Sequence, residues 1–452
     1  MIKKILLAWL FFLILSVVVP PLFHKRAEAG GWDITTEYGD ADAAERALVI
    51  DDNTEALLWR LRLIENAKER IILVTFEFWD DNSGTDIMSA LLAAADRGVQ
   101  VQVMVDGIGG VMRLGGSGHF KELTSHPNVE VRFYNTISLL TPWKANYRMH
   151  DKYLIADDFA YILGGRNTGD LFLGDYKASY NEDRDILVYE TVSGRGRSYC
   201  QLVEHFEQVW NLPCCKPYKG YGKAKGELPE HYLWLQQEYK EAFESVDWIL
   251  ETQETDGLTL LSSEIGPSNK KPLVWQALVD KMQGESDVLM ITPYIICSKD
   301  MYRDMEALSE SGVRLSIIIN AVESGANPFG CTDYLNQKDQ ILDVSTEVCE
   351  YWGDQSLHTK TVLLGEHTSI VGSCNIDMRS VYLDTELMLV IESSQITKEL
   401  REYAKEMKSK SKIVSSDGVQ FGENYKEESI TAGKKLLYGI LRILIVPFRQ
   451  LL

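Results

Sequence analysis

Two segments of this 452-residue chain carry the same side chains at the same spacing. The first reads MHDKYLIADDFAYILGGRN, from Met149 to Asn167, and the second LHTKTVLLGEHTSIVGSCN, from Leu357 to Asn375. In each, a lysine follows a histidine by two positions, and an asparagine follows that histidine by seventeen. Matched chemistry at matched spacing indicates two copies of one structural unit, which constrains the fold more than a single motif would.

Each copy predicts a strand, a tight turn and a returning strand. A histidine and a lysine two positions apart point to the same face of a strand. Each returning strand ends at a glycine or glycine pair, where the backbone can approach a ligand closely. We therefore expect the asparagines beside the His-Lys pairs. The predicted first strands are 153–156 and 361–364, and the turns are Asp157-Asp158 and Gly365-Glu366.

Two facing hairpins of this kind gather groups that suit a phosphodiester. A neutral imidazole can attack phosphorus, and a protonated imidazole can donate to the leaving oxygen. Lysines and amides can bind the non-bridging oxygens, so we expect neither a metal nor another cofactor. Unrelated hairpins with surface histidines are the plain alternative, against which the equal spacing argues. The predicted catalytic residues are His150, Lys152, Asn167, His358, Lys360 and Asn375.

Strand and helix patterns alternate in both halves of the chain, which predicts an α/β fold with two units. We place these units at 40–240 and 241–430, because the connection at 211–260 is rich in Lys, Pro, Gly and Glu near its start. The expected strands are 71–78, 99–105, 129–134, 287–292 and 313–319, and the expected helices are 86–97, 232–245, 274–282 and 301–311.

Glycines at 107, 109 and 110 follow a predicted strand and resemble part of a dinucleotide-binding turn. That turn needs a helix at once and an acid about twenty residues on. Glycines at 115, 116 and 118 instead predict a continuing loop, so an active-site loop or a plain connection is favoured.

The net charge of −20 argues against nucleic acid as a partner, because phosphate binding needs a basic face. None of the seven cysteines forms a CxxC pair, which disfavours a structural zinc site. Cys331 and Cys349 bracket a loop-like stretch and leave a disulfide open, although free or buried thiols are favoured.

Both ends of the chain have lipid-directed character. Residues 1–29 combine Lys3 and Lys4, an apolar run and a small-x-small pattern at 27–29, so they form either a signal peptide or an N-terminal membrane anchor. Residues 433–452 are basic and apolar, which predicts an amphipathic segment lying in a membrane interface. A final helix docked on the core is the alternative.

The doubled motif resembles that of the phospholipase D superfamily, H-x-K-x4-D followed by G-G/S-x-N, and the resemblance covers residues 45 to 430. GSCNIDMRS (372–380) and DTELMLVIES (384–393) are similar to the bacterial cardiolipin synthase branch. FEFWDDNSG (76–84), RMHDK and GGRNTGD are similar to its C-type members.

The resemblance implies two similar lobes, each a mixed β-sheet flanked by helices, with one active site at their interface. It also implies a membrane-associated enzyme of the bacterial envelope that makes cardiolipin from phospholipids through a phosphohistidine. Hydrolysis of phospholipids to phosphatidic acid is an alternative, as is a secreted phosphodiesterase or nuclease of the same superfamily. The resemblance names no partner protein.

Carried over by position, the resemblance adds Asp157 as the acid of the first motif and Ser373 as a phosphate-binding aid. Asp183 and Glu386 match the acids that orient the imidazoles in many members, or else are ordinary strand carboxylates. Two positions depart from the pattern. Arg166 stands where many members have Ser, and Gly365 stands where the second motif has Asp. Because Gly365 is predicted in a turn, its effect should fall on stability rather than chemistry, although a non-catalytic scaffold stays open.

Overall fold

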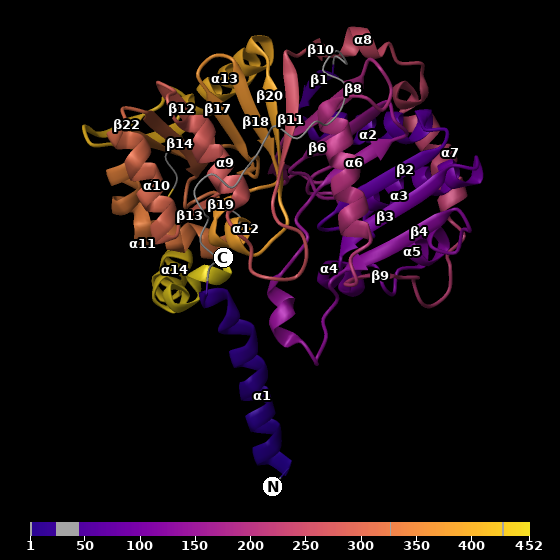
Figure 1. Ribbon diagram of the computed structural model, residues 1–452, viewed down its shortest axis with the longest axis horizontal. Helices are drawn as coiled ribbons and strands as arrows, with labels where there is room; N and C mark the ends of the chain where they lie inside the picture. Colours follow the sequence, from indigo (N-terminus) through magenta and orange to yellow (C-terminus); the bar gives the residue numbers. More distant parts are fainter. Residues whose placement is uncertain (1, 24–44, 326, 427–428) are drawn as a thin grey trace.

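A nine-stranded mixed sheet forms the centre of the first lobe (Figure 1). The computed structural model describes residues 2–23, 45–325, 327–426 and 429–452. Strands β2, β3 and β4 are parallel, and the others pair antiparallel. Across the sheet the order is β10 (Gln253–Glu254), β1 (Glu45–Ile50), β8 (Asp185–Glu190), β6 (Ala160–Gly164), β5 (Tyr153–Ala156), β2 (Arg70–Thr75), β3 (Gln100–Asp106), β4 (Val129–Tyr134) and β9 (Cys215–Pro217).

The second lobe repeats this topology. Eight of the nine strands follow the same order and pairing, with β12, β14 and β15 parallel, and of the described strands only β10 and β22 at the sheet edges lack a counterpart, so the two-lobed α/β prediction is confirmed. The predicted strands 129–134, 153–156 and 361–364 have the observed bounds. The order is β11 (Gly257–Ser262), β20 (Leu387–Glu392), β18 (Thr368–Gly372), β17 (Thr361–Leu364), β12 (Asp287–Ile291), β14 (Arg314–Asn320), β15 (Glu347–Tyr351), β21 (Ser411–Ser415) and β22 (Gly418–Phe421).

Helices cover both sheets, and polar side chains begin several of them. Asp81 caps the helix that follows β2 by accepting the backbone N–H of Gly84. In the first lobe the helices are α2 (Asn53–Asn66), α3 (Asn82–Asp96), α4 (Gly107–Arg113), α5 (Gly118–Leu123), α6 (Arg197–Trp210), α7 (Leu228–Glu238) and α8 (Trp248–Glu251). In the second they are α9 (Leu273–Met282), α10 (Lys299–Glu310), α11 (Pro328–Val344), α12 (Met378–Tyr382) and α13 (Ser394–Ser409).

The lobes share a hydrophobic core. Ile72 and Val74 of β2 belong to the same buried cluster as Leu289 and Ile291 of β12. Burying apolar surface between two sheets favours one arrangement of the lobes. A short parallel pair also crosses the interface, between β7 (Asn181–Glu182) and β16 (Ser356–Leu357). A second short parallel pair lies within the second lobe, between β13 (Ile295–Ile296) and β19 (Ile376–Asp377).

The boundary predicted at 240 is about fifteen residues too early. β10 still pairs with β1, and Leu235 and Ala242 are buried in the first lobe's core. The junction therefore lies at residues 255–256. The helix predicted over 232–245 begins earlier, at Leu228, and gives way to a short 3-10 helix, η3 (Lys240–Phe243).

One local prediction changes, and the favoured interpretation of two cysteines is confirmed. A helix, α4, does begin at Gly107, but its N-terminus is occupied, since the carboxylate of Asp106 accepts the N–H of Ile108. Cys331 and Cys349 are free, buried thiols. The stretch between them is helix α11 rather than a loop, and it holds them on separate elements.

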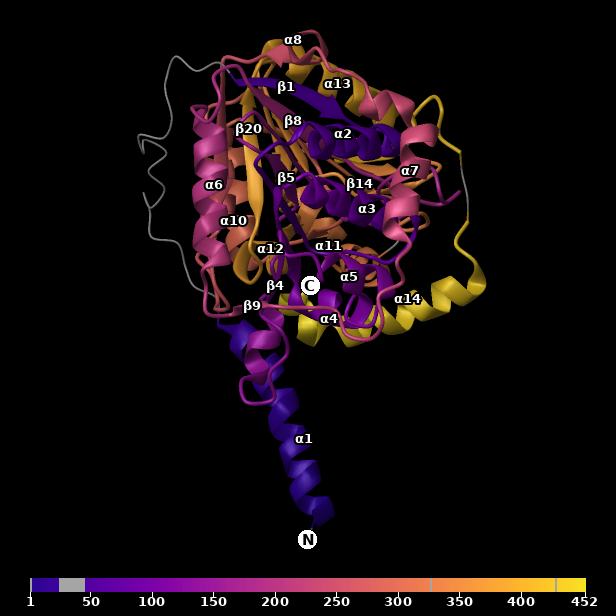
Figure 2. The ribbon, with the colours of Figure 1, turned by 90° about the vertical axis from the view of Figure 1, so that its right-hand side faces the viewer.

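The two ends of the chain lie at the same end of the molecule. Helix α1 (Ile2–Val18) projects from the body, and α14 (Ala432–Ile445) runs across the surface beside it (Figures 1 and 2). No helix among the described residues is long and apolar enough to cross a membrane. The small-x-small pattern at 27–29 lies outside the described residues. Short 3-10 helices, η1 (Pro20–Leu22) and η4 (Val446–Leu451), follow α1 and α14.

The C-terminal segment is docked and yet exposes an apolar face. Tyr438 is buried in the second lobe's core, and the guanidinium of Arg449 binds the buried carboxylate of Asp333 at 2.8 Å. The opposite side of α14 presents Leu436, Ile440 and Ile443 to solvent. The structure therefore shows the alternative that we considered, a final helix docked on the core. The exposed side of the same helix is apolar, as expected for an amphipathic segment.

Candidate active site

The backbone ties each motif histidine to the opposite lobe. The N–H of His150 donates to the carbonyl of Thr385 at 3.1 Å, and the N–H of His358 donates to the carbonyl of Glu182 at 2.7 Å. The two bonds are equivalent, because Thr385 and Glu182 each directly precede a carboxylate residue. The repeat therefore places the two histidines in matching positions on either side of the interface.

The carboxylates themselves are exchanged between the lobes. Nδ1 of His150 lies 2.9 Å from Glu386, and Nδ1 of His358 lies 2.5 Å from Asp183. Both carboxylates are fully buried. Each acid therefore orients the histidine of the other motif rather than its own. Engaging Nδ1 in this way leaves Nε2 to the substrate.

The motif lysines lie under the histidines. Nζ of Lys152 donates to the carbonyl of His150, and Nζ of Lys360 donates to that of His358. Nζ of Lys360 is also 3.3 Å from Nε2 of His358. Burial lowers the pKa of Lys152 to about 8 and lowers that of Lys360 as well. Two buried ammonium groups favour an anion between them.

The two halves of the site differ electrostatically. Burial raises the pKa of Glu386 well above its usual range, with Lys152 opposing the shift. Burial also acts on Asp183, but the charges of Lys360 and His358 outweigh it and hold its pKa below the ordinary value. Asp183 is therefore a carboxylate anion, whereas Glu386 resists ionisation.

The pKa values of the two histidines also differ, because only His358 has a carboxylate anion beside it. Burial, then the charges of Lys152 and Lys360, lower the pKa of His150 well below its usual value. Burial and Lys360 lower the pKa of His358, but Asp183 works against them. His150 is thus the imidazole held neutral, and His358 is the one with an anion to stabilise a proton.

The two asparagines bond to the segments that follow β2 and β12, and their place beside the His-Lys pairs stays a prediction. Oδ1 of Asn167 accepts the N–H of Glu77 at 3.1 Å, and Nδ2 of Asn375 lies 3.5 Å from the hydroxyl of Tyr294. Ser373 donates to Glu386 at 2.5 Å, so it supports the acid rather than contacting a histidine.

Four flanking residues were not predicted. The ring of Phe76 packs edge-on to His150 at 5.0 Å, and Phe172 packs likewise on His358 at 5.1 Å. Glu77 and Tyr294 occupy equivalent positions, each two residues after a threonine whose hydroxyl bonds to their carbonyl. A threonine that ends or directly follows each strand, Thr75 for β2 and Thr292 for β12, is the sequence signal that could have located Glu77 and Tyr294.

Asp157 is not part of this cluster, which corrects its prediction as a catalytic residue. It lies at the far end of β5 from His150, and its carboxylate accepts the backbone N–H groups of residues 68, 69 and 70. Its φ is 47°, and Gly365 has a φ of 52° in the equivalent turn. Asp157 therefore fixes a turn, and Gly365 adopts the same left-handed conformation without a side chain to strain.

Comparison with known proteins agrees with this geometry. The family described as "Cardiolipin synthase, PLD-like domain" matches residues 61–210 and 278–408, more than half of the chain. The chain belongs to this family.

Curated cardiolipin synthases are similar over most of their length. Cardiolipin synthase C of Escherichia coli is 28% identical over 399 residues, covering 77% of this chain and 81% of that protein. Cardiolipin synthase B of Shigella flexneri is 25% identical, covering 75% of each. The crystal structure of phosphatidylserine synthase from Haemophilus influenzae has the same fold, with a TM-score of 0.64 and 16% identity over 91% of this chain and 98% of that one.

Hydrogen bonds join the segment 76–84 to the segment that follows Asn167. Asp81 accepts the N–H of Asp170, and Asp170 in turn accepts the N–H of Ser83, both at 2.9 Å. Arg166, the departure in the first motif, is buried and donates to the carbonyls of Ile50 and Asp51. Arg166 thus anchors the segment that carries Asn167 to β1, and its charge helps to lower the pKa of Asp183.

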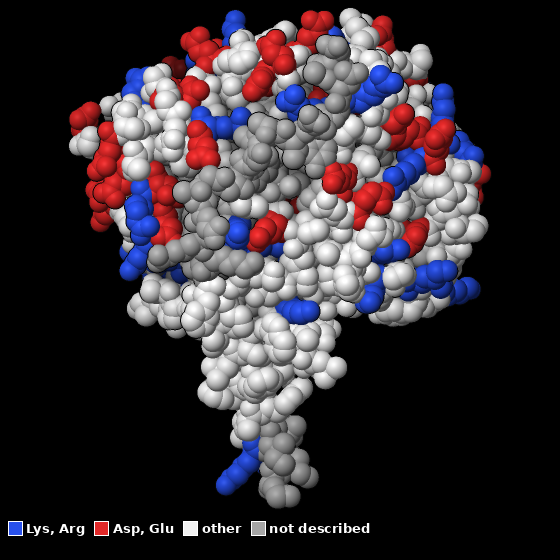
Figure 3. Space-filling model, viewed as in Figure 1, with Lys and Arg blue, Asp and Glu red and all other residues white. Residues whose placement is uncertain are grey.

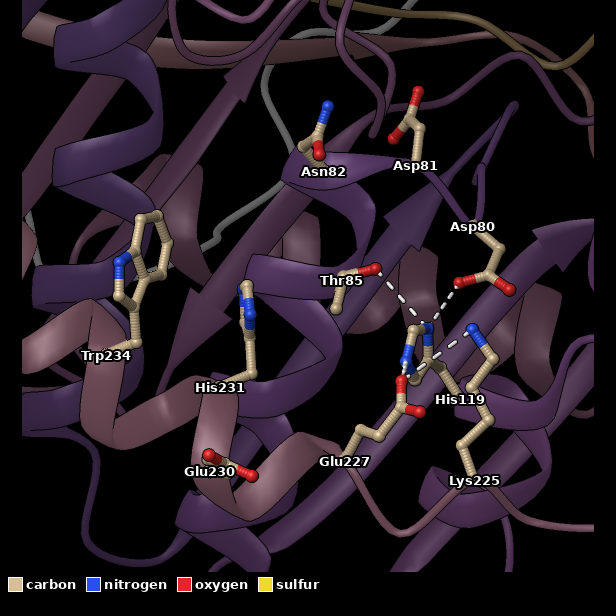
Figure 4. A pocket seen from close by; sticks show the side chains of 10 residues that line it. All are labelled: Asp80, Asp81, Asn82, Thr85, His119, Lys225, Glu227, Glu230, His231 and Trp234. Atoms are coloured by element: carbon tan, nitrogen blue, oxygen red, sulfur yellow. Dashed lines mark hydrogen bonds and ion pairs between the residues drawn. The ribbon is translucent and has the colours of Figure 1, made fainter.

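A separate hollow of about 530 Å³ lies in the first lobe and is lined in part by Asp81. Figure 4 shows the side chains around it. His119 there is held between Asp80 at 2.7 Å and Glu227 at 3.1 Å, so its polar groups satisfy one another. No group of three or more His, Cys, Asp or Glu among the described residues could hold a metal ion. The residues lining this hollow are Asp80, Asp81, Asn82, Thr85, His119, Lys225, Glu227, Glu230, His231 and Trp234.

Proposed function

We propose that this member of the cardiolipin synthase family moves a phosphatidyl group from one lipid alcohol to another at a bacterial membrane, giving cardiolipin. The observation that carries the proposal is the exchange of acids between the lobes, His150 with Glu386 and His358 with Asp183. Through this exchange, the two copies of the motif form one site, in which the two histidines have different carboxylate partners. The names and extent of the similar proteins support cardiolipin as the product.

In the first step, Nε2 of His150 attacks the phosphorus of the donor lipid. The bond from phosphorus to the headgroup oxygen breaks, and that oxygen takes a proton from Nε2 of His358. His150 suits the nucleophile because its pKa is lowered well below the usual value, which keeps its lone pair available. The product is a phosphatidyl group on His150 and a free headgroup alcohol.

In the second step, the hydroxyl of the acceptor lipid attacks the same phosphorus. Its proton passes to Nε2 of His358, the phosphorus–nitrogen bond breaks, and His150 is regenerated. The anion of Asp183 stabilises the proton on His358 in both steps. One imidazole thus remains the nucleophile while the other alternates between acid and base.

Lys152, Lys360, Asn167 and Asn375 supply the groups for the non-bridging oxygens. The lysines are 2% and 1% exposed, so their charge is available to a bound phosphate with little competition from water. This chemistry calls for no divalent ion, and we expect a chelator to leave turnover unchanged. A loss of activity in chelator that a divalent ion restored would contradict the proposal.

The alternative readings have less support. A nuclease is disfavoured by the net charge of −20 and by the similarity to lipid synthases. A non-catalytic scaffold was motivated by Gly365, but this residue lies in a turn away from the histidines. Hydrolysis to phosphatidic acid competes at the second step, where water can replace the acceptor hydroxyl.

The test is transfer between defined lipids. Purified full-length protein is given vesicles that contain a labelled donor phospholipid and phosphatidylglycerol, and the labelled products are separated. We expect labelled cardiolipin with the wild type and none with His150→Ala. Phosphatidic acid as the sole product would replace the synthase with a lipase, and no lipid product at all would leave the proposal without support.

A further inference from the structure

The loop between β4 and η2 (Pro142–Asn146) exposes a cluster of apolar side chains. Leu140 is 88% exposed, and Ile137 and Leu139 are more than half exposed. The hydrophobic effect disfavours such exposure in water, so the cluster needs an apolar environment to cover it.

The base of this loop is fixed to the active site. Asn135, with a φ of 47°, donates from Nδ2 to the carbonyls of Lys144 at 2.7 Å and Tyr147 at 2.8 Å, which closes the loop. Arg148 donates to the carbonyl of Asn135 at 3.0 Å and binds the buried carboxylate of Asp106. His150 follows two residues later, so these hydrogen bonds tie the loop to the segment that carries the proposed nucleophile.

The same loop contacts both ends of the chain. Asn146 donates to the carbonyl of Val17 in α1. The guanidinium of Arg379 donates to the carbonyls of Asn146 at 2.9 Å and Leu451 at 3.1 Å. The loop, α1 and the α14–η4 segment therefore form one surface at the lower end of the molecule in Figures 1 and 2.

This surface is basic, in contrast to the body. Segments 2–23, 135–147 and 432–452 contain no aspartate or glutamate, in a chain of net charge −20. They contain seven lysines and arginines, of which Arg449 is paired with the buried carboxylate of Asp333. On the face shown in Figure 3, acidic side chains are spread over the upper body and none appears at the lower end around α1. Apolar side chains with basic neighbours and no acids match the surface of an anionic bilayer.

We infer that residues 137–140 insert into the lipid bilayer and place the entrance of the active site against the membrane surface. The inference deepens the proposed function and rests on it, since it supplies the route by which a lipid phosphate reaches His150. In this arrangement the segments at the two ends of the chain hold the protein on the bilayer. Residues 137–140 orient the protein so that the active site faces the lipid headgroups.

The test separates membrane-bound from monomeric substrate. The variant Ile137→Ser/Leu139→Ser/Leu140→Ser is compared with the wild type on phosphatidylglycerol–phosphatidylethanolamine vesicles and on monomeric dihexanoyl phosphatidylglycerol. We expect turnover on vesicles to fall at least ten-fold, with co-sedimentation reduced, while turnover on the monomeric lipid stays within two-fold. The matched control is Ile249→Ser/Leu250→Ser on α8, where Leu250 is 80% exposed at the opposite end of the molecule (Figure 1).

A second variant, Leu140→Asp, guards against loss of folding, because so exposed a side chain makes little packing contact. It should lower vesicle turnover by charge repulsion, and Leu140→Lys should lower it less. Unchanged vesicle turnover, equal losses on both substrates, or an equal loss in the α8 control would overturn the inference. A wild type that is inactive on both substrates would instead overturn the proposed function.

Discussion

Nδ1 of His358 in the second lobe lies 2.5 Å from a carboxylate oxygen of Asp183 in the first. The charge of Asp183 opposes the burial that lowers the pKa of His358, and this contact distinguishes His358 from His150. The two histidines occupy equivalent positions in the repeat, and the contact of His358 with Asp183 is what gives them different roles.

Removing the charge of Asp183 should disable the acid–base histidine. We expect Asp183→Asn to lower kcat by on the order of 10²–10⁴-fold, the usual contribution of general acid–base catalysis. The pKa of His358 would fall further, so the limb of the pH profile that falls toward high pH should move to lower pH. Asp158→Asn, at an exposed turn position of the same lobe, is the control and should match the wild type.

The two histidines can be told apart with a donor that needs no acid. On a phosphatidyl p-nitrophenol, the leaving group departs without a proton, so His358→Ala should still release one equivalent of p-nitrophenol in a burst and stall as the phosphoenzyme. His150→Ala should give no burst. On natural phospholipids, each substitution should abolish turnover, because nucleophile and acid act together. A burst in His150→Ala and none in His358→Ala would reverse the assignment.

The dependence of rate on pH should be bell-shaped. His150 must be neutral to attack, so activity is lost as pH falls through its pKa, which burial places below about 6.5. His358 must be protonated, so activity is lost as pH rises through its pKa, which burial and Lys360 hold below the usual value. Lys152, whose pKa is about 8, must be charged to bind phosphate, so loss of its proton removes the remaining activity. We expect kcat/KM to fall as pH drops through the pKa of His150, and to fall as pH rises in two stages, the second by about pH 8. A flat profile between about pH 5 and 9 would contradict chemistry by two histidines.

The turn residues should affect stability without affecting chemistry. Asp157→Ala removes the acceptor of three backbone N–H groups, and we expect a loss of about 1–2 kcal/mol in the free energy of unfolding with kcat unchanged. Gly365→Asp should change stability less, because Asp157 adopts nearly the same φ in the equivalent turn and the new Cβ would meet only a carboxylate oxygen of Glu285, at 2.9 Å, on a side chain that can turn away. Urea denaturation and the transfer assay measure the two effects separately. A rise in kcat for Gly365→Asp would show that the departure weakens the site.

Local pattern was enough to predict the two hairpins, because turn residues and strand periodicity act over a few positions. The partner of each histidine could not be predicted in the same way. Asp183 lies 175 positions from His358 and much closer to His150, and only the packing of the two sheets brings it across. The C-terminal segment was ambiguous for a related reason, since an amphipathic helix offers one face to a core and another to lipid.

The last prediction concerns the partition between synthesis and hydrolysis. Water always competes for the phosphohistidine, so transfer needs a lipid hydroxyl held at high effective concentration beside it. The outward face of α14 would maintain that concentration by keeping the site on the bilayer. Deleting the segment would expose the buried carboxylate of Asp333, so surface substitution is the cleaner change. Leu436→Ser/Ile440→Ser/Ile443→Ser removes apolar side chains without touching Arg449 or Tyr438.

We expect this variant to lower the ratio of cardiolipin to phosphatidic acid formed on vesicles by at least three-fold, because a site that leaves the bilayer more often meets water more often. Its rate on monomeric dihexanoyl phosphatidylglycerol should match the wild type, since the histidines and lysines are unaltered. Ile443 is 76% exposed, so its replacement costs little packing, and the same thermal midpoint in both proteins would verify this. If the product ratio stayed constant while vesicle binding fell, the acceptor would have to be selected by the site itself, and the bilayer would serve only to supply lipid.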